Sequence, residues 1–457
     1  MCVFRPLEII ALFDYGIMHQ MNSHLRTLLL GVLVAIAVLT LISAMRKERR
    51  HWNRSAWFVL GLGWVMSSAP AWGAWSRGRY ISEDVFGNFQ VRFVGLAAAL
   101  SRYSWPLVGA GSLAMIFLAF KHHTRVSTAG LAFLGLWVAG VVSNGFNQLP
   151  IFTWGLFATG AAICAATVLP SGRGAILGAA VLGVSVAIVS IFLVIFRPEE
   201  AISGCRLGKC GPFGVLLFGA EGNENALGLI LALALPFVAM AFSGRFRTLL
   251  VIFMALVVWA TGSRSSLIAV VATLMVLVVC NPHIDERLRW RGRFKSFAVV
   301  VLIGGGAIGL GLPFVTSDLN AYSLRGEVWR VAREALPHSW ILGSGADGWS
   351  TLRSTGRISA VSIYSTHNLW LDALFSAGFV GLMLALIGLS LLVRNGVFWV
   401  TILPLSAIFY AGIMERSWTV STANWLVWVL PAMILTMGSS EGLPLVRKKI
   451  NGGNVSS

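Results

Sequence analysis

Apolar runs of membrane-span length recur along the whole chain, and they constrain the fold more than any other feature. The 457 residues are 57% hydrophobic, with a mean hydropathy of +0.79. One helix of about 20 mostly apolar residues crosses a bilayer. A water-soluble fold is therefore excluded, and the sequence predicts an all-α, polytopic integral membrane protein of about 12–13 transmembrane helices. The expected helices lie near residues 25–45, 56–75, 105–120, 126–144, 150–168, 174–196, 223–243, 248–261, 265–280, 297–315, 368–393, 396–414 and 424–438.

Lys and Arg gather in every second break between these helices. The chain has 35 Lys and Arg against 18 Asp and Glu, a net charge of +17. In a soluble protein this excess would suggest nucleic acid, but in a membrane protein it marks the loops that stay in the cytoplasm. With the basic breaks inside, the excess divides into +15 inside and +2 outside. We therefore expect a multi-pass protein of the inner (cytoplasmic) membrane, with membrane lipid around it and no nucleic-acid partner.

The expected organisation is a single transmembrane domain. It covers residues 25–438, between an N-terminal arm at 1–24 and a cytoplasmic tail at 439–457. The arm has two internal methionines, so an arm outside the membrane and a misassigned start both fit. The largest soluble segment is an outer loop at 316–367, before the last three helices.

Two cysteines share one polar loop on the expected outer side. Cys205 and Cys210 enclose the sequence CRLGKC. A disulfide forms there if the loop faces an oxidising compartment, and both redox states remain open. Two thiols are too few for a zinc site, and no His, Cys and carboxylate cluster has metal-ligand spacing. We therefore expect no intrinsic metal and no cofactor.

Two arginines stand at outer ends of helices. Arg264 lies in the turn ATGSRSS, where it either reaches lipid headgroups or binds an anion. Arg325 opens SLRGEVWRVAREALPHSW, whose spacing predicts an amphipathic helix on the membrane surface, with Arg325 and Trp329 on one face. Arg330 and Glu334 can pair along it. A solvated basic face is the alternative to a phosphate site.

His367 stands where the chain re-enters the membrane, in STHNLWLDALFSAGFVG. A lone histidine at a helix start is usually a cap or a core residue. Its titration range also suits proton transfer near neutral pH. Asp372 follows Asn368 by one helical turn, so its carboxylate could orient this site or pair with an arginine.

Two further polar motifs give weaker signals. Glu221, Glu224 and Asn225 in GAEGNENALG precede an apolar helix, where they either cap its N-terminus or line an outward cavity. The string GSGADG at 343–348 has no strand and helix around it, so we expect a glycine turn and not a dinucleotide site.

The order of these motifs resembles the O-antigen ligase and polymerase superfamily, membrane glycosyltransferases that use lipid-linked donors. The resemblance covers residues 210–393 and includes GNENALG, TGSR, LRGEVW and GSGADG. Its most specific element is His-Asn, nine residues, then Gly-x-x-Gly, here His367, Asn368, Gly378 and Gly381. An extra first helix departs from the family's usual cytoplasmic start.

The resemblance implies a role for each motif. Arg264 and Arg325 would bind the diphosphate of an undecaprenyl-type donor, and His367 would activate the acceptor, in a metal-independent, inverting transfer on the extracytoplasmic face. The acceptor is a hydroxyl or amide on a glycan, lipid or protein, so ligase, polymerase and protein O-oligosaccharyltransferase all remain open. The further candidates for substrate binding are Asn368, Asp372, Asn225, Glu221, Trp329 and Arg330.

A transporter or flippase of lipid-linked sugars is the alternative from another class. Transporters place ionisable groups near the bilayer midplane, between repeated halves. This sequence has no evident halves, and its Arg and His candidates lie at the outer edge. A non-enzymatic scaffold that binds polyprenyl diphosphate is the third reading.

Overall fold

The computed structural model describes most of the chain between residues 23 and 437. The predicted tail and the arm up to residue 22 lie outside the described residues, as do Cys2 and Cys280. The described ranges are 23–83, 89–121, 126–205, 209–279, 291–336, 339–354, 365–396, 398–418 and 425–437.

Long helices dominate the fold, and each of the thirteen expected helices has a counterpart. Among the described residues, seven helices are long and apolar enough to cross a membrane. The prediction of an all-α, polytopic membrane protein is therefore confirmed. The helices are α2 (Ser23–Lys47), α3 (Arg54–Ser76), α4 (Gly95–Phe120), α5 (Thr128–Phe146), α6 (Trp154–Val168), α7 (Arg173–Phe196), α8 (Pro198–Ala201), α9 (Glu224–Ala241), α10 (Gly244–Ala260), α11 (Arg264–Val279), α13 (Arg291–Val315), α14 (Ala321–Ala335), α15 (Gly348–Ser354), α16 (Leu369–Asn395), α17 (Phe398–Gly412) and α18 (Val429–Met437), with short 3-10 turns η1 (Arg49–His51) and η2 (Gly219–Glu221).

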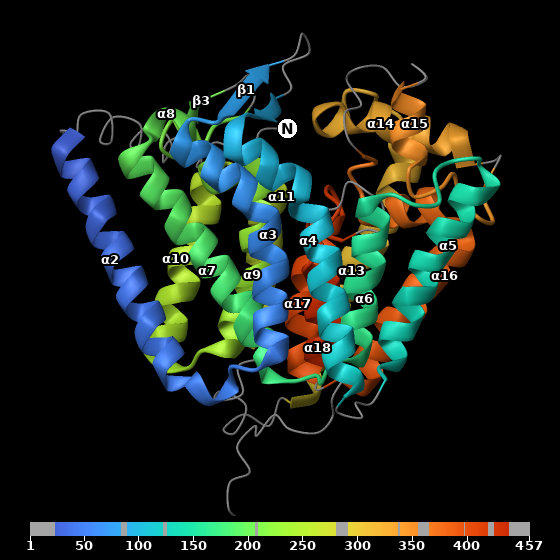
Figure 1. Cartoon of the computed structure of the whole chain (residues 1–457), viewed down its shortest axis with the longest axis horizontal. Helices are drawn as coiled ribbons and strands as arrows, with labels where there is room; N and C mark the ends of the chain where they lie inside the picture. Colours follow the sequence, from blue (N-terminus) through green and yellow to red (C-terminus); the bar gives the residue numbers. More distant parts are fainter. Residues whose placement is uncertain are drawn as a thin grey trace, which may run out of the picture.

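Two small antiparallel hairpins lie at one end of the bundle (Figure 1). β1 (Arg79–Glu83) pairs with β2 (Phe89–Phe93), and β3 (Ile202–Gly204) pairs with β4 (Val215–Leu217). The sequence did not predict them, because their strands are short and flank long helices. We call this end, with α14 and α15, the loop end. The opposite end, where α2 stops at Lys47, is the basic end.

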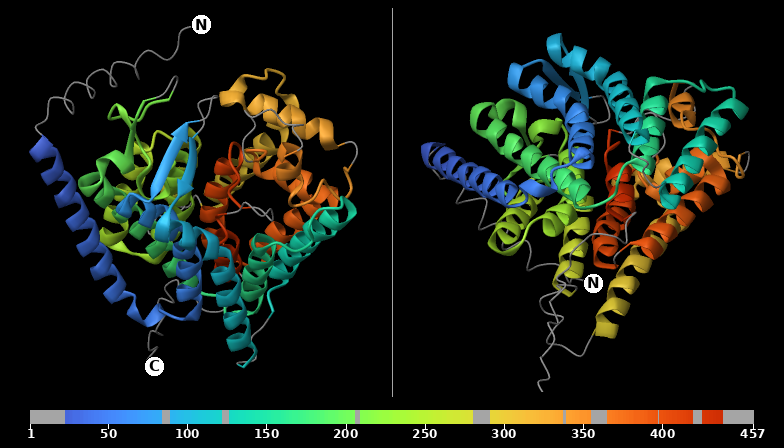
Figure 2. Two further views of the ribbon diagram at one scale, coloured as in Figure 1. Left: turned by 45° about the horizontal axis from the view of Figure 1, so that its top comes forward. Right: turned by 60° about the horizontal axis from the view of Figure 1, so that its bottom comes forward.

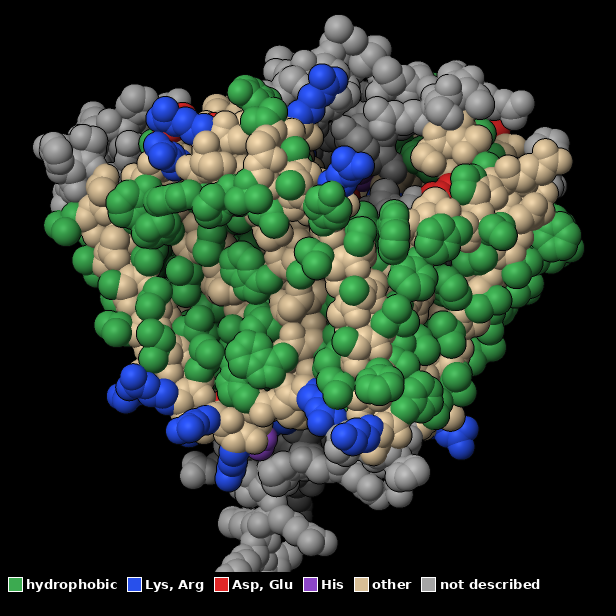
Figure 3. All heavy atoms as spheres, in the orientation of Figure 1, with side chains coloured by type: hydrophobic (Ala, Val, Ile, Leu, Met, Phe, Trp, Pro, Cys, Tyr) green, Lys and Arg blue, Asp and Glu red, His purple; other side chains and the backbone are tan. Residues whose placement is uncertain are grey.

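An apolar band crosses the middle of the face drawn in Figure 3, and Lys and Arg side chains line its basic end. Large side chains on the outer helices are widely exposed, including Leu39 on α2 and Phe117 on α4 at 65% and 75%. Exposed apolar surface of this extent is stable only when another apolar phase covers it. The band is therefore the surface that a bilayer would cover.

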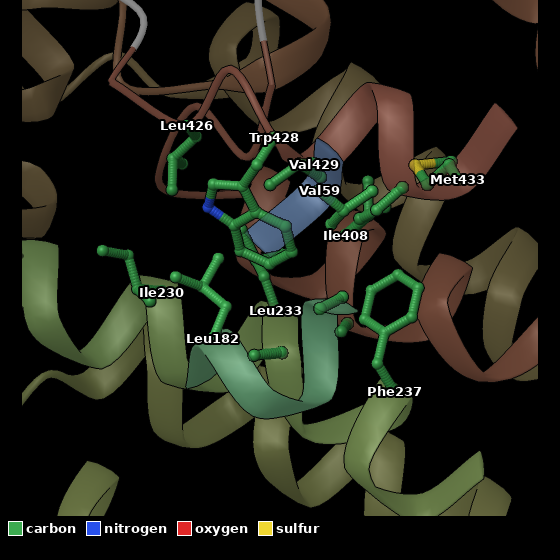
Figure 4. Packing of buried hydrophobic residues seen from close by; sticks show 14 of the residues in the cluster. Val59, Leu182, Ile230, Leu233, Phe237, Ile408, Leu426, Trp428, Val429 and Met433 are labelled. Atoms are coloured by element: carbon green, nitrogen blue, oxygen red, sulfur yellow. The ribbon is translucent and has the colours of Figure 1, made fainter. Parts of the chain in front are cut away.

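The core lies where α3, α7, α9, α17 and α18 meet (Figure 4). The Trp428 ring stands edge-on to Phe237, with 6.3 Å between ring centroids. α7 lies close against α3 at Gly178, where a Cβ would clash with the carbonyl of Ala56. Small residues allow such close approach of helices in lipid, where apolar burial gives little drive for association.

A break in α16 frees backbone groups that bond to the segment following α14. Gly378 interrupts the helix with φ of 64°, so nearby backbone groups lose their helical partners. The amide of Phe379 donates to the carbonyl of Trp340 at 2.8 Å, and the amide of Ser344 donates to the carbonyl of Phe375 at 2.6 Å. The segment after α14 is thus held against α16, and Figure 2 shows α14 and α15 above α16 at the loop end.

Candidate active site

α14 is an amphipathic helix whose apolar face is occupied by protein. Trp329 packs in a cluster with Trp349 and with Phe375 of α16. Its side chain has no exposed surface, and its Nε1 donates to the carbonyl of Thr366 at 2.9 Å. The apolar face of α14 therefore packs on protein, not on the membrane surface, and joins α14 to the segment that leads into α16. Trp329, which the sequence suggested as a candidate for substrate binding, holds α14 against this segment.

Arg325 reaches from α14 to Glu415, which follows α17. Its Nη2 donates to Oε1 of Glu415, and its Nη1 donates to the carbonyl of Tyr322 at 3.1 Å. Within the described part of the chain, the Nε of Arg325 is buried and has no hydrogen-bond partner. The two bonds use two of the five N–H donors of this guanidinium, which leaves donors for another acceptor.

His367 occupies a left-handed turn, with φ of 48°, that Asn368 holds in place. The Oδ1 of Asn368 accepts from the amide of Leu371 at 2.8 Å and caps α16. Its Nδ2 donates to the carbonyls of Gly309 and Ile413, at 2.7 and 3.0 Å. Asn368 is fully buried, and these bonds use both protons of its amide. A non-glycine residue at positive φ is uncommon and persists where its surroundings fix it.

Glu415 connects two of the candidate catalytic residues, Arg325 and His367. The Nδ1 of His367 lies 3.1 Å from its Oε2, while its Oε1 accepts from Arg325. Burial alone would raise the pKa of this carboxyl, but the charges of Arg325, His367 and Lys209 outweigh burial and lower the pKa to about 2. Glu415 is therefore ionised at neutral pH and lies between Arg325 and His367.

The sequence analysis missed Glu415 and its neighbour Arg416. In the sequence they resemble an ordinary boundary between two spans, and Glu415 is 48 positions from His367. Arg416 lies 3.8 Å from Asp372, so Asp372 pairs with an arginine, though not with either expected one. An acidic and a basic residue together at an outer span boundary are the signal that could have marked this site.

A second ion pair lies at the start of α9. The Nζ of Lys209 donates to Oε1 of Glu224 at 2.6 Å and to Oδ1 of Asn225 at 2.8 Å. The expectation that Glu221, Glu224 or Asn225 caps this helix was wrong. Asn223 is the cap, because its side chain accepts from the amides at 225 and 226. Lys209, inside the cysteine loop, was also missed.

Arg264 begins α11 and is exposed. The turn before it packs against the cysteine loop, since a Cβ on Gly262 would lie 3.1 Å from the amide nitrogen of Gly211. The hydrogen bonds that join Arg325 and His367 through Glu415 do not include Arg264. The structure thus places the Arg264 turn beside the loop that carries Lys209.

Two other candidates have partners of their own. Burial raises the pKa of Glu221 to about 7, against the opposing effects of a hydrogen bond with Ser67 and the charge of Arg79. Arg330 pairs with Glu334 at 2.7 Å on the exposed side of α14, as the i, i+4 spacing predicted.

The cysteine loop is closed by a disulfide between Cys205 and Cys210. The loop follows directly on β3, and Cys164 in α6 is a free thiol. Among the residues that the structure describes, no three His, Cys, Asp or Glu side chains are grouped to hold a metal ion.

A family model described as O-Antigen ligase matches residues 249–386. The match confirms the resemblance that the motifs predicted, and it contains Arg264, Arg325 and His367. Lys209 and Glu415 lie outside the matched range. No curated protein and no solved structure matches the chain.

Proposed function

With residues 249–386 matching the O-antigen ligase family, we propose that this protein transfers a glycan from an undecaprenyl-diphosphate-type donor to a hydroxyl or amide of an acceptor. One observation carries the proposal. The carboxylate of Glu415 holds the Arg325 guanidinium and the His367 imidazole together. The reaction needs a cation for the departing diphosphate and a base for the acceptor, and this pair supplies both.

His367 acts as the general base. The ionised carboxylate of Glu415 accepts a hydrogen bond from Nδ1–H of His367, which leaves the lone pair of Nε2 for the acceptor. The acceptor oxygen attacks the anomeric carbon while its proton passes to Nε2. The bond between that carbon and the diphosphate oxygen breaks, and the diphosphate leaves on the polyprenyl chain. Direct displacement inverts the anomeric configuration.

Arg325 and Arg264 bind the diphosphate. A guanidinium presents its donors in a planar fork that suits phosphate oxygens. The Arg325 side chain is 18% exposed, and its bonds to Tyr322 and Glu415 use two of its five N–H donors, so a further donor can bond to phosphate while Nη2 keeps Glu415. Arg264 is exposed at the start of α11, whose backbone amides also attract anions. Two guanidinium groups can neutralise the leaving group without a divalent ion.

The loop end faces the outside of the cytoplasmic membrane. Lys and Arg at the basic end mark the side retained in the cytoplasm (Figure 3). The disulfide beside β3 fits an oxidising compartment at the other end. Lipid-linked glycans are presented on that outer side once they have been flipped.

Ligase-like transfer is the form that we propose, because the His-Asn pair is followed at ligase spacing by Gly378 and Gly381. An O-antigen polymerase or a protein O-oligosaccharyltransferase would use the same groups with a different acceptor.

Reconstitution into liposomes tests this function. The protein is given a polyprenyl-diphosphate oligosaccharide and, separately, lipid, glycan and peptide acceptors. We expect one acceptor to gain the glycan with inverted configuration, and one polyprenyl diphosphate to be released for each transfer. Movement of intact donor across the bilayer, with no diphosphate released, would instead identify a flippase and contradict the proposal.

A further inference from the structure

Lys209 occupies a position that links the separate polar segments of the loop end. Its ammonium group bonds to Glu224 and Asn225 at the start of α9, and its charge acts on the carboxylate of Glu415. Two residues further on, Gly211 packs against the turn that precedes Arg264. The Lys209 loop therefore connects the turn of one proposed phosphate ligand to the carboxylate that holds the other.

The Lys209 side chain is not fully buried. It is 23% exposed, whereas Glu224 beneath it is 1% exposed. A lysine that served only to neutralise a buried carboxylate would gain most from full burial beside it, since water weakens an ion pair. The Lys209 side chain instead stays partly exposed while Glu224 and Asn225 fix its position.

We infer that Lys209 is a third cation for the donor diphosphate, and that the Cys205–Cys210 disulfide holds it at the site. This inference rests on the glycan transfer proposed above. A donor diphosphate carries more negative charge than one guanidinium neutralises, and Lys209, Arg264 and Arg325 lie on three different segments. An ammonium binds phosphate oxygens as a compact point charge and complements the planar arginines.

The disulfide constrains the backbone on both sides of this lysine. Lys209 directly precedes Cys210, and Cys205 directly follows β3, which is paired with β4. After the disulfide, the amide of Gly211 donates to the carbonyl of Val215 at 3.1 Å. A side chain at Gly211 would meet the carbonyls of Val215 and Ala260. With the bond intact, Lys209 is anchored from both directions; without it, the residues before Gly211 are released.

Charge-matched variants separate binding from simple neutralisation of Glu224. Lys209→Met leaves a buried carboxylate unpaired, and Lys209→Met with Glu224→Gln removes both charges. We expect the donor KM to rise about tenfold to a hundredfold in both, the range for one charge-assisted hydrogen bond. The acceptor KM should stay unchanged, and Lys209→Arg should retain most donor affinity. If the double variant regains the native donor KM, Lys209 only neutralises Glu224 and the inference is overturned.

The disulfide is tested with Cys205→Ser combined with Cys210→Ser, and with Cys164→Ser as the matched control for loss of a thiol. The double variant should raise the donor KM in the same direction as Lys209→Met but by less, and combining the two changes should raise KM little beyond the value for Lys209→Met alone. An unchanged donor KM would show that the disulfide does not hold Lys209. If His367→Ala abolishes transfer while every Lys209 variant retains the native donor KM, this inference alone fails. If His367→Ala also transfers normally, the proposed function fails as well.

Discussion

The Nδ1 of His367 lies 3.1 Å from the Oε2 of Glu415, and the other oxygen of that carboxylate accepts a hydrogen bond from Arg325. One buried anion therefore sets the position of the proposed base and of a proposed phosphate ligand. Helix α14, which carries Arg325, and the turn before α16, which carries His367, both meet Glu415 at the loop end. There, Asn368 fixes the start of α16.

Replacing Glu415 with Gln should slow catalysis without unfolding the protein. An amide accepts one hydrogen bond but does not stabilise the imidazolium that forms when His367 takes a proton. We expect kcat to fall by about 10²–10⁴, the range for loss of an oriented general base. Steady-state transfer in liposomes measures it, with Glu334→Gln, on the exposed side of α14, as the control. A native kcat in Glu415→Gln would rule out the proposed role of the carboxylate.

Arg264→Lys tests recognition of phosphate by a planar fork. Lysine keeps the charge but loses the paired donors, so we expect the donor KM to rise about tenfold, equivalent to about 1.4 kcal/mol. The control is Arg245→Lys, which replaces a guanidinium at the start of α10. Full activity with native donor KM in Arg264→Lys would show that Arg264 does not bind phosphate through two donors.

Glu221 should make the folded protein less stable as pH rises toward neutrality. Its pKa is raised from 4.5 to about 7 by burial, so the folded state favours the protonated carboxyl. The stability gained from this protonation is complete below about pH 4.5 and is lost as pH rises through about 7. Glu221→Gln stays neutral, so its Tm relative to the native protein should be higher at pH 8 than at pH 5. Thermal unfolding in detergent measures both, and an equal difference at the two pH values would contradict the prediction.

Gly378→Ala should destabilise the loop end. Gly378 has φ of 64°, and a Cβ there would clash with the carbonyl of Ile341. Strain at positive φ and the steric conflict together cost about 2–5 kcal/mol. Gly304→Ala is the matched control, because a Cβ at Gly304 meets nothing within 4 Å. Comparable Tm values for the two variants would show that the break in α16 does not require glycine.

The helices could be predicted from the sequence because span length and hydropathy are local properties. The hairpin strands could not, since they are three to five residues long and their pairing depends on the helices beside them. The cap of α9 was assigned to the wrong residue because several polar residues in GNENALG could cap it. Only the backbone shows that Asn223 is the residue in the extended conformation.

The site was predicted in part. Arg325 and His367 could be found because polar residues at span edges are costly and stand out. Glu415 could not, because it lies 90 positions from Arg325 and 48 from His367, and only the packing of α14, α16 and α17 brings them together. Lys209 is separated from Glu224 by 15 positions and by a hairpin whose pairing was not predicted.

The most direct test of the central claim compares His367→Ala with His51→Ala. Both histidines face a glutamate, but His51 lies beside Glu48 at the basic end. Transfer and donor binding are measured on the same liposomes. We expect His367→Ala to lose transfer by at least about a hundredfold while it binds donor normally, and His51→Ala to retain both. Transfer at the native rate in His367→Ala would contradict the proposed mechanism.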